Sequence, residues 1–177
     1  MSDSLLSAAK ALSEATHVPW PRVNAIYREL QEAEELPVSA GRRIWYASPQ
    51  LVARLLIGVA GDLVMIGAVP AVAAYREALS PDGEKLETAL ARELTGSSEV
   101  SLFGLGGLGG GASVFNDSGM TQFSPGPDFQ GDMIDRPFAV SLNVAVNIRA
   151  FEHLRAAVAW RGADEPPYGP PSRKART

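Results

Sequence analysis

The chain has 177 residues, which suits one medium domain or two small ones, and 46% of them are hydrophobic, enough for a core. It contains no cysteine, which excludes a disulfide framework and a thiolate zinc site and fits a reducing cytoplasm. The formal net charge of −4 is modest and indicates no particular partner. The first residues, Met1–Ser4, lack the basic start of a signal peptide, so we expect a cytoplasmic protein.

The N-terminal part of the chain has the pattern of a helix-turn-helix. Leu5–Leu12 is a short helix former, Ala15–Pro19 breaks it, and Trp20–Leu30 is a second helix with Pro21 in its first turn, where proline is well tolerated. Apolar residues repeat at helical spacing in the second helix and predict one buried stripe: Val23, Ile26, Tyr27 and Leu30.

The other face of that second helix carries candidate DNA contacts. Asn24 and Arg28 lie one turn apart, with Arg22 beside them and Trp20 at the start of the helix. Arginine and asparagine have the side-chain donors that match guanine and adenine edges in the major groove. A helix placed after a tight turn is how this motif presents such groups to DNA. Plain helix packing is the alternative interpretation of the same pattern.

A short basic and aromatic hairpin is predicted to follow. In Leu36–Tyr46 a Ser-Ala-Gly turn separates two β-prone runs, which resembles the wing of a winged helix. Arg42 and Arg43 lie at the expected tip, where they are candidates for phosphate contacts. The alternative is a solvated turn whose arginines contact nothing specific.

Charge limits how tightly one copy of this region is expected to bind DNA. Residues 1–60 hold six basic and six acidic side chains, whereas a nucleic-acid-binding domain is usually basic. Several acidic residues lie at or beyond the end of the second helix, which leaves its first half basic. Binding should therefore gain from a homo-oligomer that multiplies the contacts.

The middle of the chain is predicted to be helical. Leu55–Tyr75 is long enough to span a bilayer, but glycines, Pro70 and the charged Asp62 interrupt it, so two buried helices are favoured over a membrane span. Ser48 and a following proline start the first helix, which should run to about residue 60 and end at Gly61. A second starts near Pro70, and Glu84–Leu94 is a third, amphipathic helix.

From residue 97 the pattern changes to short strands. The expected strands are Glu99–Phe103, Ala112–Phe115, Met120–Phe123 and Phe138–Asn147, and a helix over Arg149–Trp160 follows. The last segment, 161–177, is rich in proline and is predicted to be a disordered tail.

No motif in the chain predicts catalysis, a metal site or a cofactor site. Gly104–Gly109 matches the G-x-G-x-x-G pattern of dinucleotide-binding proteins, but no helix can open at its third glycine, so a loop between strands is favoured. His17 and His153 have no partner at metal-ligand spacing, and the aspartates of the later loops suit turns.

The residues quoted above also support a resemblance to a family. Leu12–Thr16 with Val23, Tyr27 and Leu30, followed by Ser48–Ile57, resembles small helix-turn-helix proteins of alphaproteobacterial prophages. The resemblance covers roughly residues 1–60 and implies phage DNA handling. Small terminase subunits are similar in plan, but this chain lacks their long heptad-patterned segment.

We therefore expect an α+β protein: a winged-helix-like domain over 1–60, a mixed assembly or partner-binding domain over 61–160, and a tail. The expected function is a DNA-binding transcriptional regulator of phage origin, not an enzyme. A DNA-packaging recognition subunit and a non-DNA interaction module are the alternatives. The expected partners are double-stranded DNA, a second copy of the chain and another phage or host protein, with no membrane. We expect a dimer whose interface lies in the apolar helices of 49–95.

Overall fold

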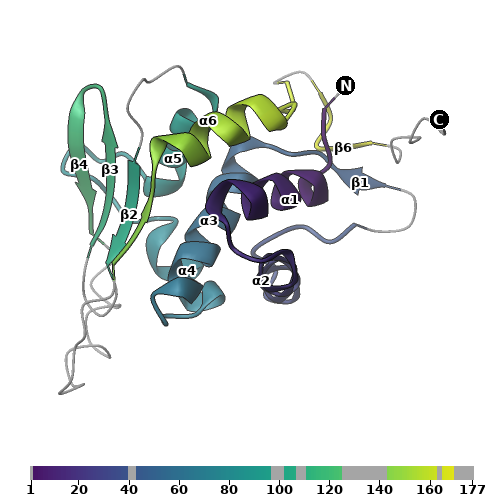
Figure 1. Cartoon of the computed structure of the whole chain (residues 1–177), viewed down its shortest axis with the longest axis horizontal. Coiled ribbons are helices and arrows are strands. Elements are labelled where there is room, and N and C mark those ends of the chain that lie inside the picture. Colours follow the sequence, from purple (N-terminus) through teal and green to yellow (C-terminus); the bar gives the residue numbers. More distant parts are fainter. Residues whose placement is uncertain are drawn as a thin grey trace.

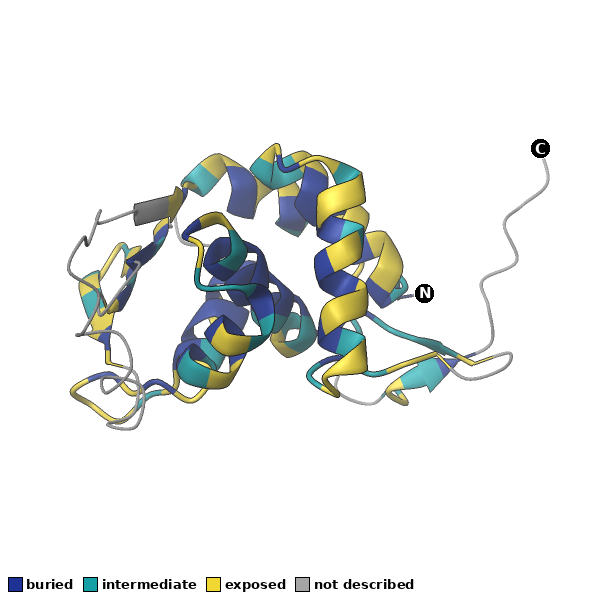
Figure 2. Cartoon of the chain, turned by 90° about the horizontal axis from the view of Figure 1, so that it is seen from below, coloured by how far each residue is buried: buried dark blue, intermediate teal, exposed yellow. Residues whose placement is uncertain are grey.

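The computed structural model describes residues 2–39, 43–96, 102–106, 111–124, 143–162 and 165–169. It is an α+β fold in which helices occupy the centre and a small antiparallel sheet lies at one end (Figure 1). The α+β class predicted from the sequence is confirmed. Buried residues gather where the helices meet, and exposed residues lie on their outer sides (Figure 2).

The first two helices follow the predicted helix-turn-helix. Helix α1 spans Leu5–Thr16 and α2 spans Trp20–Glu32. The Ser4 hydroxyl accepts a hydrogen bond from the Ser7 N–H at 3.0 Å and so caps α1. Both helices pack on each other and on the third helix. The predicted stripe of α2 is confirmed, since its four members are the buried residues of that helix: Val23, Ile26, Tyr27 and Leu30.

Helix α3, Pro49–Leu63, is the centre of the core and packs against α1, α2, α4 and α5. The Ser48 hydroxyl accepts from the Leu51 N–H at 3.3 Å, as the predicted cap requires. The helix continues past Gly61, where we expected it to end. A Cβ atom on Gly61 would come within 2.0 Å of the Ala71 Cβ, so the glycine serves a close approach of two helices instead of ending one.

Two further helices complete the central layer. Helix α4 spans Ala68–Tyr75, with Pro70 in its first turn, and α5 spans Leu86–Thr95. The apolar segment that resembled a membrane span is thus divided between α3 and α4. Among the described residues, no helix has the length and apolar character needed to cross a membrane.

Four short antiparallel strands form the main sheet, in the order β4-β3-β2-β5. They are β2 Leu102–Gly106, β3 Ala112–Asn116, β4 Gly119–Phe123 and β5 Asn143–Val146. The sheet packs on α3 and α5 through the buried side chains Phe103, Leu105, Ala112, Val114 and Phe123. The glycine-rich segment follows β2 and leads into β3, although residues 107–110 lie outside the described part.

Helix α6, Ile148–Ala157, joins the sheet end of the molecule to its N-terminal end, because it packs on both α1 and α5. Arg155 from α6 donates to the Glu93 main-chain oxygen, and the Glu93 side chain, 1% exposed, accepts from Asn116 of β3 at 2.9 Å. One hydrophobic cluster runs through all these elements. The boundary that we expected between residues 60 and 61 lies inside α3.

A second, two-stranded sheet joins the ends of the chain. Strand β1, Ile44–Trp45, pairs antiparallel with β6, Tyr168–Gly169. Ser2 also donates a hydrogen bond to Glu165. Part of the segment that we expected as a disordered tail, residues 165–169, is therefore ordered against β1 and the start of the chain.

Candidate nucleic-acid interface

The outer face of α2 presents two polar side chains that the rest of the described chain does not use. Asn24 is half-buried and Arg28 is exposed, one helical turn further on. Within the described residues, neither side chain makes a hydrogen bond or an ion pair. Both border a groove of about 410 Å³ between α2, the start of α1 and the residues Val38, Ser39 and Ile44.

Gln31 fixes the wall of this groove, and the sequence analysis did not identify it. Its amide nitrogen donates to the Pro37 carbonyl at 2.8 Å and to the Tyr27 hydroxyl at 3.2 Å. The first bond holds the chain leaving α2 against the helix. The sequence does show a glutamine one turn after Arg28 on the same face. Its bond to Pro37, however, depends on where the chain turns after α2, which the sequence does not show.

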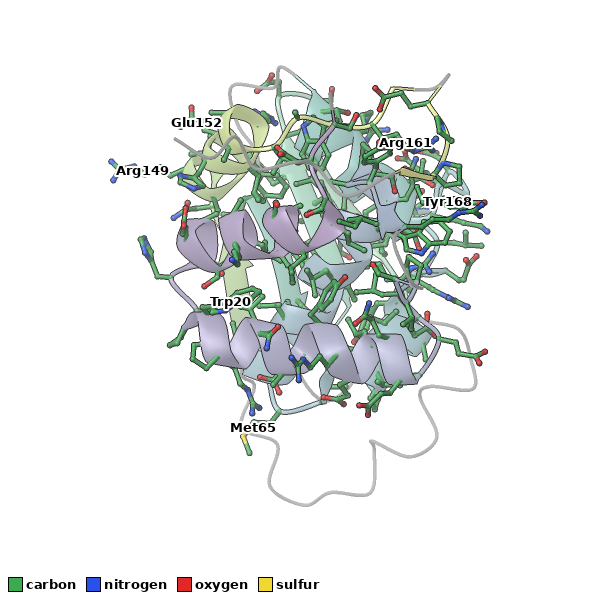
Figure 3. All side chains as sticks on the ribbon, turned by 90° about the vertical axis from the view of Figure 1, so that its right-hand side faces the viewer. Trp20, Met65, Arg149, Glu152, Arg161 and Tyr168 are labelled. Atoms are coloured by element: carbon green, nitrogen blue, oxygen red, sulfur yellow. The ribbon has the colours of Figure 1, made fainter. Side chains whose placement is uncertain are left out.

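Trp20 lies between α1 and α2, as Figure 3 shows. The Lys10 ammonium of α1 lies 5.6 Å from the centroid of its ring, a cation–π distance. Trp20 therefore joins the two helices, and its contact brings the positive charge of Lys10 to the start of α2. Sequence alone did not indicate which face of α1 meets Trp20.

Arg22 is held away from Asn24 and Arg28. Residues two positions apart in a helix, such as Arg22 and Asn24, point to nearly opposite sides of it. Arg22 instead donates two hydrogen bonds to Asp62 of α3, Nε–Oδ2 at 2.8 Å and Nη2–Oδ1 at 2.5 Å. The hydrogen bonds that Arg22 donates to Asp62 raise the pKa of Arg22 above its ordinary value. Its side chain is 59% exposed, but its main partner is a carboxylate of its own chain.

The predicted hairpin of residues 36–46 does not form as expected. Its second arm is β1, whose ladder partner is β6 and not the segment after α2. The two arms are joined by a side chain instead, because the Trp45 indole N–H donates to the Val38 carbonyl at 3.2 Å. Pro37 lacks an N–H and cannot contribute a full ladder, so β1 pairs with the strand that can.

Arg43 is fixed at the base of this segment, and Arg42 lies outside the described residues. The Arg43 guanidinium donates to the Tyr168 hydroxyl at 2.9 Å and lies 4.8 Å from the ring centroid. The Tyr168 ring in turn meets Trp45 edge-on, with centroids 5.4 Å apart. The C-terminal strand thus positions an arginine beside the groove.

The distribution of ion pairs separates two kinds of arginine. Several bind carboxylates of their own chain: Arg22 with Asp62, Arg54 with Glu87, Arg76 with Glu35 and Arg92 with Glu84. Within the part of the chain that the structure describes, Arg28 and Arg43 have no carboxylate partner, and neither does the exposed Arg149 of α6. Glu29 and Glu32 are exposed on the same helix, so the face is mixed in charge and its basic side is the groove side.

A second cavity, of about 360 Å³, lies where α1, α3 and α6 meet. His17, His153, Glu14 and Arg149 border it, and the His153 Nε2 lies 3.5 Å from a Glu14 carboxylate oxygen. The sequence analysis treated the two histidines as isolated, yet the fold brings both to one cavity. Among the described residues, no group of three histidine, aspartate or glutamate side chains is placed to hold a metal ion.

Comparisons with models of protein families, with curated proteins and with solved structures find no match for this chain.

Proposed function

We propose that this protein binds double-stranded DNA through α2 and the groove beside it. Asn24 and Arg28 are the proposed base-reading side chains, and Arg43 is the proposed phosphate contact. Trp20 and Lys10 flank these contacts at the start of α2. Arg42 belongs to the same proposal by its place in the sequence, while Arg22 is assigned to Asp62.

One observation carries this proposal. Asn24 and Arg28 have unused side-chain donors on one face of a helix that follows a tight turn, while most described arginines elsewhere are neutralised within the fold. In the free protein such donors bond to water, and they can exchange that water for the acceptor groups of a ligand. The edges of bases and the phosphates of DNA supply those acceptors.

The specific role that we propose is control of transcription in a phage-derived setting. It follows from the expectation, drawn from the sequence alone, that residues 1–60 resemble prophage helix-turn-helix proteins. The mixed charge of the α2 face supports a modest intrinsic affinity, since few phosphates are neutralised by one copy.

The test is binding of duplex DNA, selected from a random pool by the full-length protein, measured by fluorescence anisotropy at fixed salt. Asn24→Ala and Arg28→Ala are each expected to weaken specific binding by about 1–3 kcal/mol. Arg92→Ala is the matched control, because it removes one exposed arginine from α5, on the sheet side of the molecule.

Arg43→Ala should weaken all duplexes alike and reduce the salt dependence by about one unit of slope, as for a lost phosphate contact. Absence of any selected duplex, or equal affinity of the Asn24, Arg28 and Arg92 variants, contradicts the proposal. In that case the groove is a protein-docking surface, which was the alternative interpretation of the same helices.

A further inference from the structure

The outer face of the main sheet carries an uninterrupted apolar row. In the strand register Leu102 of β2 lies opposite Phe115 of β3, and Phe115 lies opposite Met120 of β4. All three side chains are exposed. Cross-strand neighbours touch on one face of a sheet, so the row is one surface and not three scattered residues.

The four strands of this sheet contain no charged residue, although 20% of the whole chain is charged. Natural edge strands are usually protected from pairing by charges, prolines or bulges. Strand β4, the edge strand at the margin of the molecule in Figure 1, has the sequence Gly-Met-Thr-Gln-Phe and none of the first two protections.

Apart from its end at Ser124, which pairs with Leu79, the outer edge of β4 offers a short run of main-chain donors and acceptors. The Ser124 N–H donates to the Leu79 carbonyl from this edge at 3.2 Å. Main-chain groups alternate between the two sides of a strand, so Met120 and Gln122 direct theirs to the same edge. Among the described residues, none forms a main-chain hydrogen bond with these two positions on that side.

We propose that the occupant of this edge is the same strand of a second copy, paired antiparallel about a two-fold axis at Thr121. Met120 of one copy then lies opposite Gln122 of the other, and each such pair exchanges two main-chain hydrogen bonds. The four-stranded sheets of the two copies then become one continuous sheet.

Two features of these strands fit a second copy as the occupant: they carry no charge, and their edge is complementary to itself. Each chain carries a net charge of −4, so two copies repel each other over most of their surfaces and meet at least cost where both are uncharged. The main-chain donors and acceptors of a strand edge also match those of an identical edge that is rotated by a two-fold axis. A basic or acidic partner would find no opposite charge on these strands.

This surface differs from the interface that we expected in the helices of 49–95. Most apolar side chains of that region are buried in the core of their own chain, including Val52, Leu55, Leu56, Ile57, Val64 and Val72. They are accounted for without a partner. Met65, 83% exposed in the connection after α3, is the most exposed of the large apolar side chains in that region.

The geometry predicts a specific crosslink. Directly opposed residues of a non-hydrogen-bonded antiparallel pair have Cα atoms about 4.5 Å apart, within the range that a disulfide spans. The two copies of Thr121 occupy such a pair at the proposed axis. Because the chain has no cysteine, a single introduced thiol reports on its own position.

The experiment oxidises Thr121→Cys, Met120→Cys and Met65→Cys proteins at equal concentration. Thr121→Cys is expected to give the covalent dimer fastest, by tenfold or more over Met65→Cys, which reports random collision. Met120→Cys should be slower than Thr121→Cys, because its position lies opposite Gln122. Equal rates for Thr121→Cys and Met65→Cys overturn the proposal.

Sedimentation of the unoxidised protein over a wide concentration range supplies a second readout. The wild-type protein should dimerise with rising concentration, Met120→Lys should remain monomeric, and Met65→Lys should behave as wild type. Circular dichroism checks that each variant is folded. A wild-type monomer at all concentrations, or a dimer that Met65→Lys disrupts and Met120→Lys does not, overturns the proposal. The measurements use no DNA, so they succeed or fail independently of the proposed function.

Discussion

Among the residues that the structure describes, three non-glycine residues adopt a left-handed backbone, and each follows a helix: His17 (φ 57°) after α1, Glu34 (φ 60°) after α2 and Met65 (φ 63°) after α3. After α2 and α3 the termination is the same. Glu35 N–H bonds to the Leu30 carbonyl and Ile66 N–H to the Gly61 carbonyl, both at 2.9 Å. This bond ends a helix when one residue turns left-handed, and glycine is the residue best suited to that turn.

Met65→Gly should therefore stabilise the protein by about 0.5–1 kcal/mol, since it removes the strain of a Cβ atom at positive φ from an exposed position. Urea unfolding measures the change. Ala25→Gly is the control, because it places glycine on the exposed face inside α2, where a loss of about 1 kcal/mol is expected. Destabilisation by Met65→Gly would show that the methionine contributes packing that its exposure conceals.

Burial of one tyrosine predicts a measurable pH effect. Desolvation raises the pKa of Tyr75 from 10.0 to about 12, because the charged phenolate is disfavoured in the core. The folded state holds this proton more tightly than the unfolded state, so the stabilisation is complete below the unfolded pKa. It is lost as pH rises between the two values.

The near-ultraviolet absorbance of tyrosinate follows this ionisation. The difference between the titrations of the wild-type protein and of Tyr75→Phe isolates one residue and should have its midpoint close to 12. A difference curve centred at the ordinary tyrosine value in folded protein would mean that the phenol is hydrated.

At the scale of elements, two glycines of α3 set how closely neighbouring helices approach. A Cβ on Gly61 would meet the Ala71 Cβ of α4 at 2.0 Å, whereas a Cβ on Gly58 would meet the flexible end of Leu30 at 2.8 Å. The first neighbour is rigidly attached to the backbone and cannot move aside without moving α4. The second is a side-chain methyl that can rotate.

Gly61→Ala is expected to destabilise the protein by about 1–3 kcal/mol through overpacking. Gly58→Ala should be nearly neutral, because a gain in helix propensity of about 1 kcal/mol offsets the smaller clash. Thermal and urea unfolding of the two variants give the comparison. Equal stability of both would mean that α3 and α4 separate easily, and that the close contact adds little.

At the scale of the whole molecule, strand β6 supports the segment around β1 that follows α2. Tyr168 contacts both Arg43 and Trp45, so residues far apart in sequence form one edge of the candidate DNA interface. The positioning of Arg43 therefore depends on a segment that lies outside the helix-turn-helix.

Tyr168→Ala should cost about 1–2 kcal/mol of stability through the lost aromatic and cation–π contacts. It should also weaken DNA binding alike for all sequences, as Arg43→Ala does. Tyr168→Phe keeps the ring and loses only the hydrogen bond, so it should retain most of both. If Tyr168→Ala reduced stability and left DNA binding intact, then either Arg43 would not contact phosphate or its position would not depend on Tyr168.

Much of the secondary structure was predictable because it depends on neighbours in sequence. The apolar stripe of α2, the Ser48 cap of α3 and the short strands β3 and β4 all formed as expected. Each depends on periodicity, on capping or on turn residues within a few positions, which a sequence displays directly. The face of α2 that carries Asn24 and Arg28 followed from the same stripe.

The tertiary structure alone decided the partners of particular residues. Arg22 binds Asp62 across a separation of 40 residues, and Arg43 binds Tyr168 across 125. Gly61 remains helical because Ala71 lies beside it, and β1 finds its ladder in β6. Local patterns fix which face of an element is apolar, but they carry no information on which distant element will cover it. That choice depends on the packing of the whole core, and it determines which polar side chains stay free to bind.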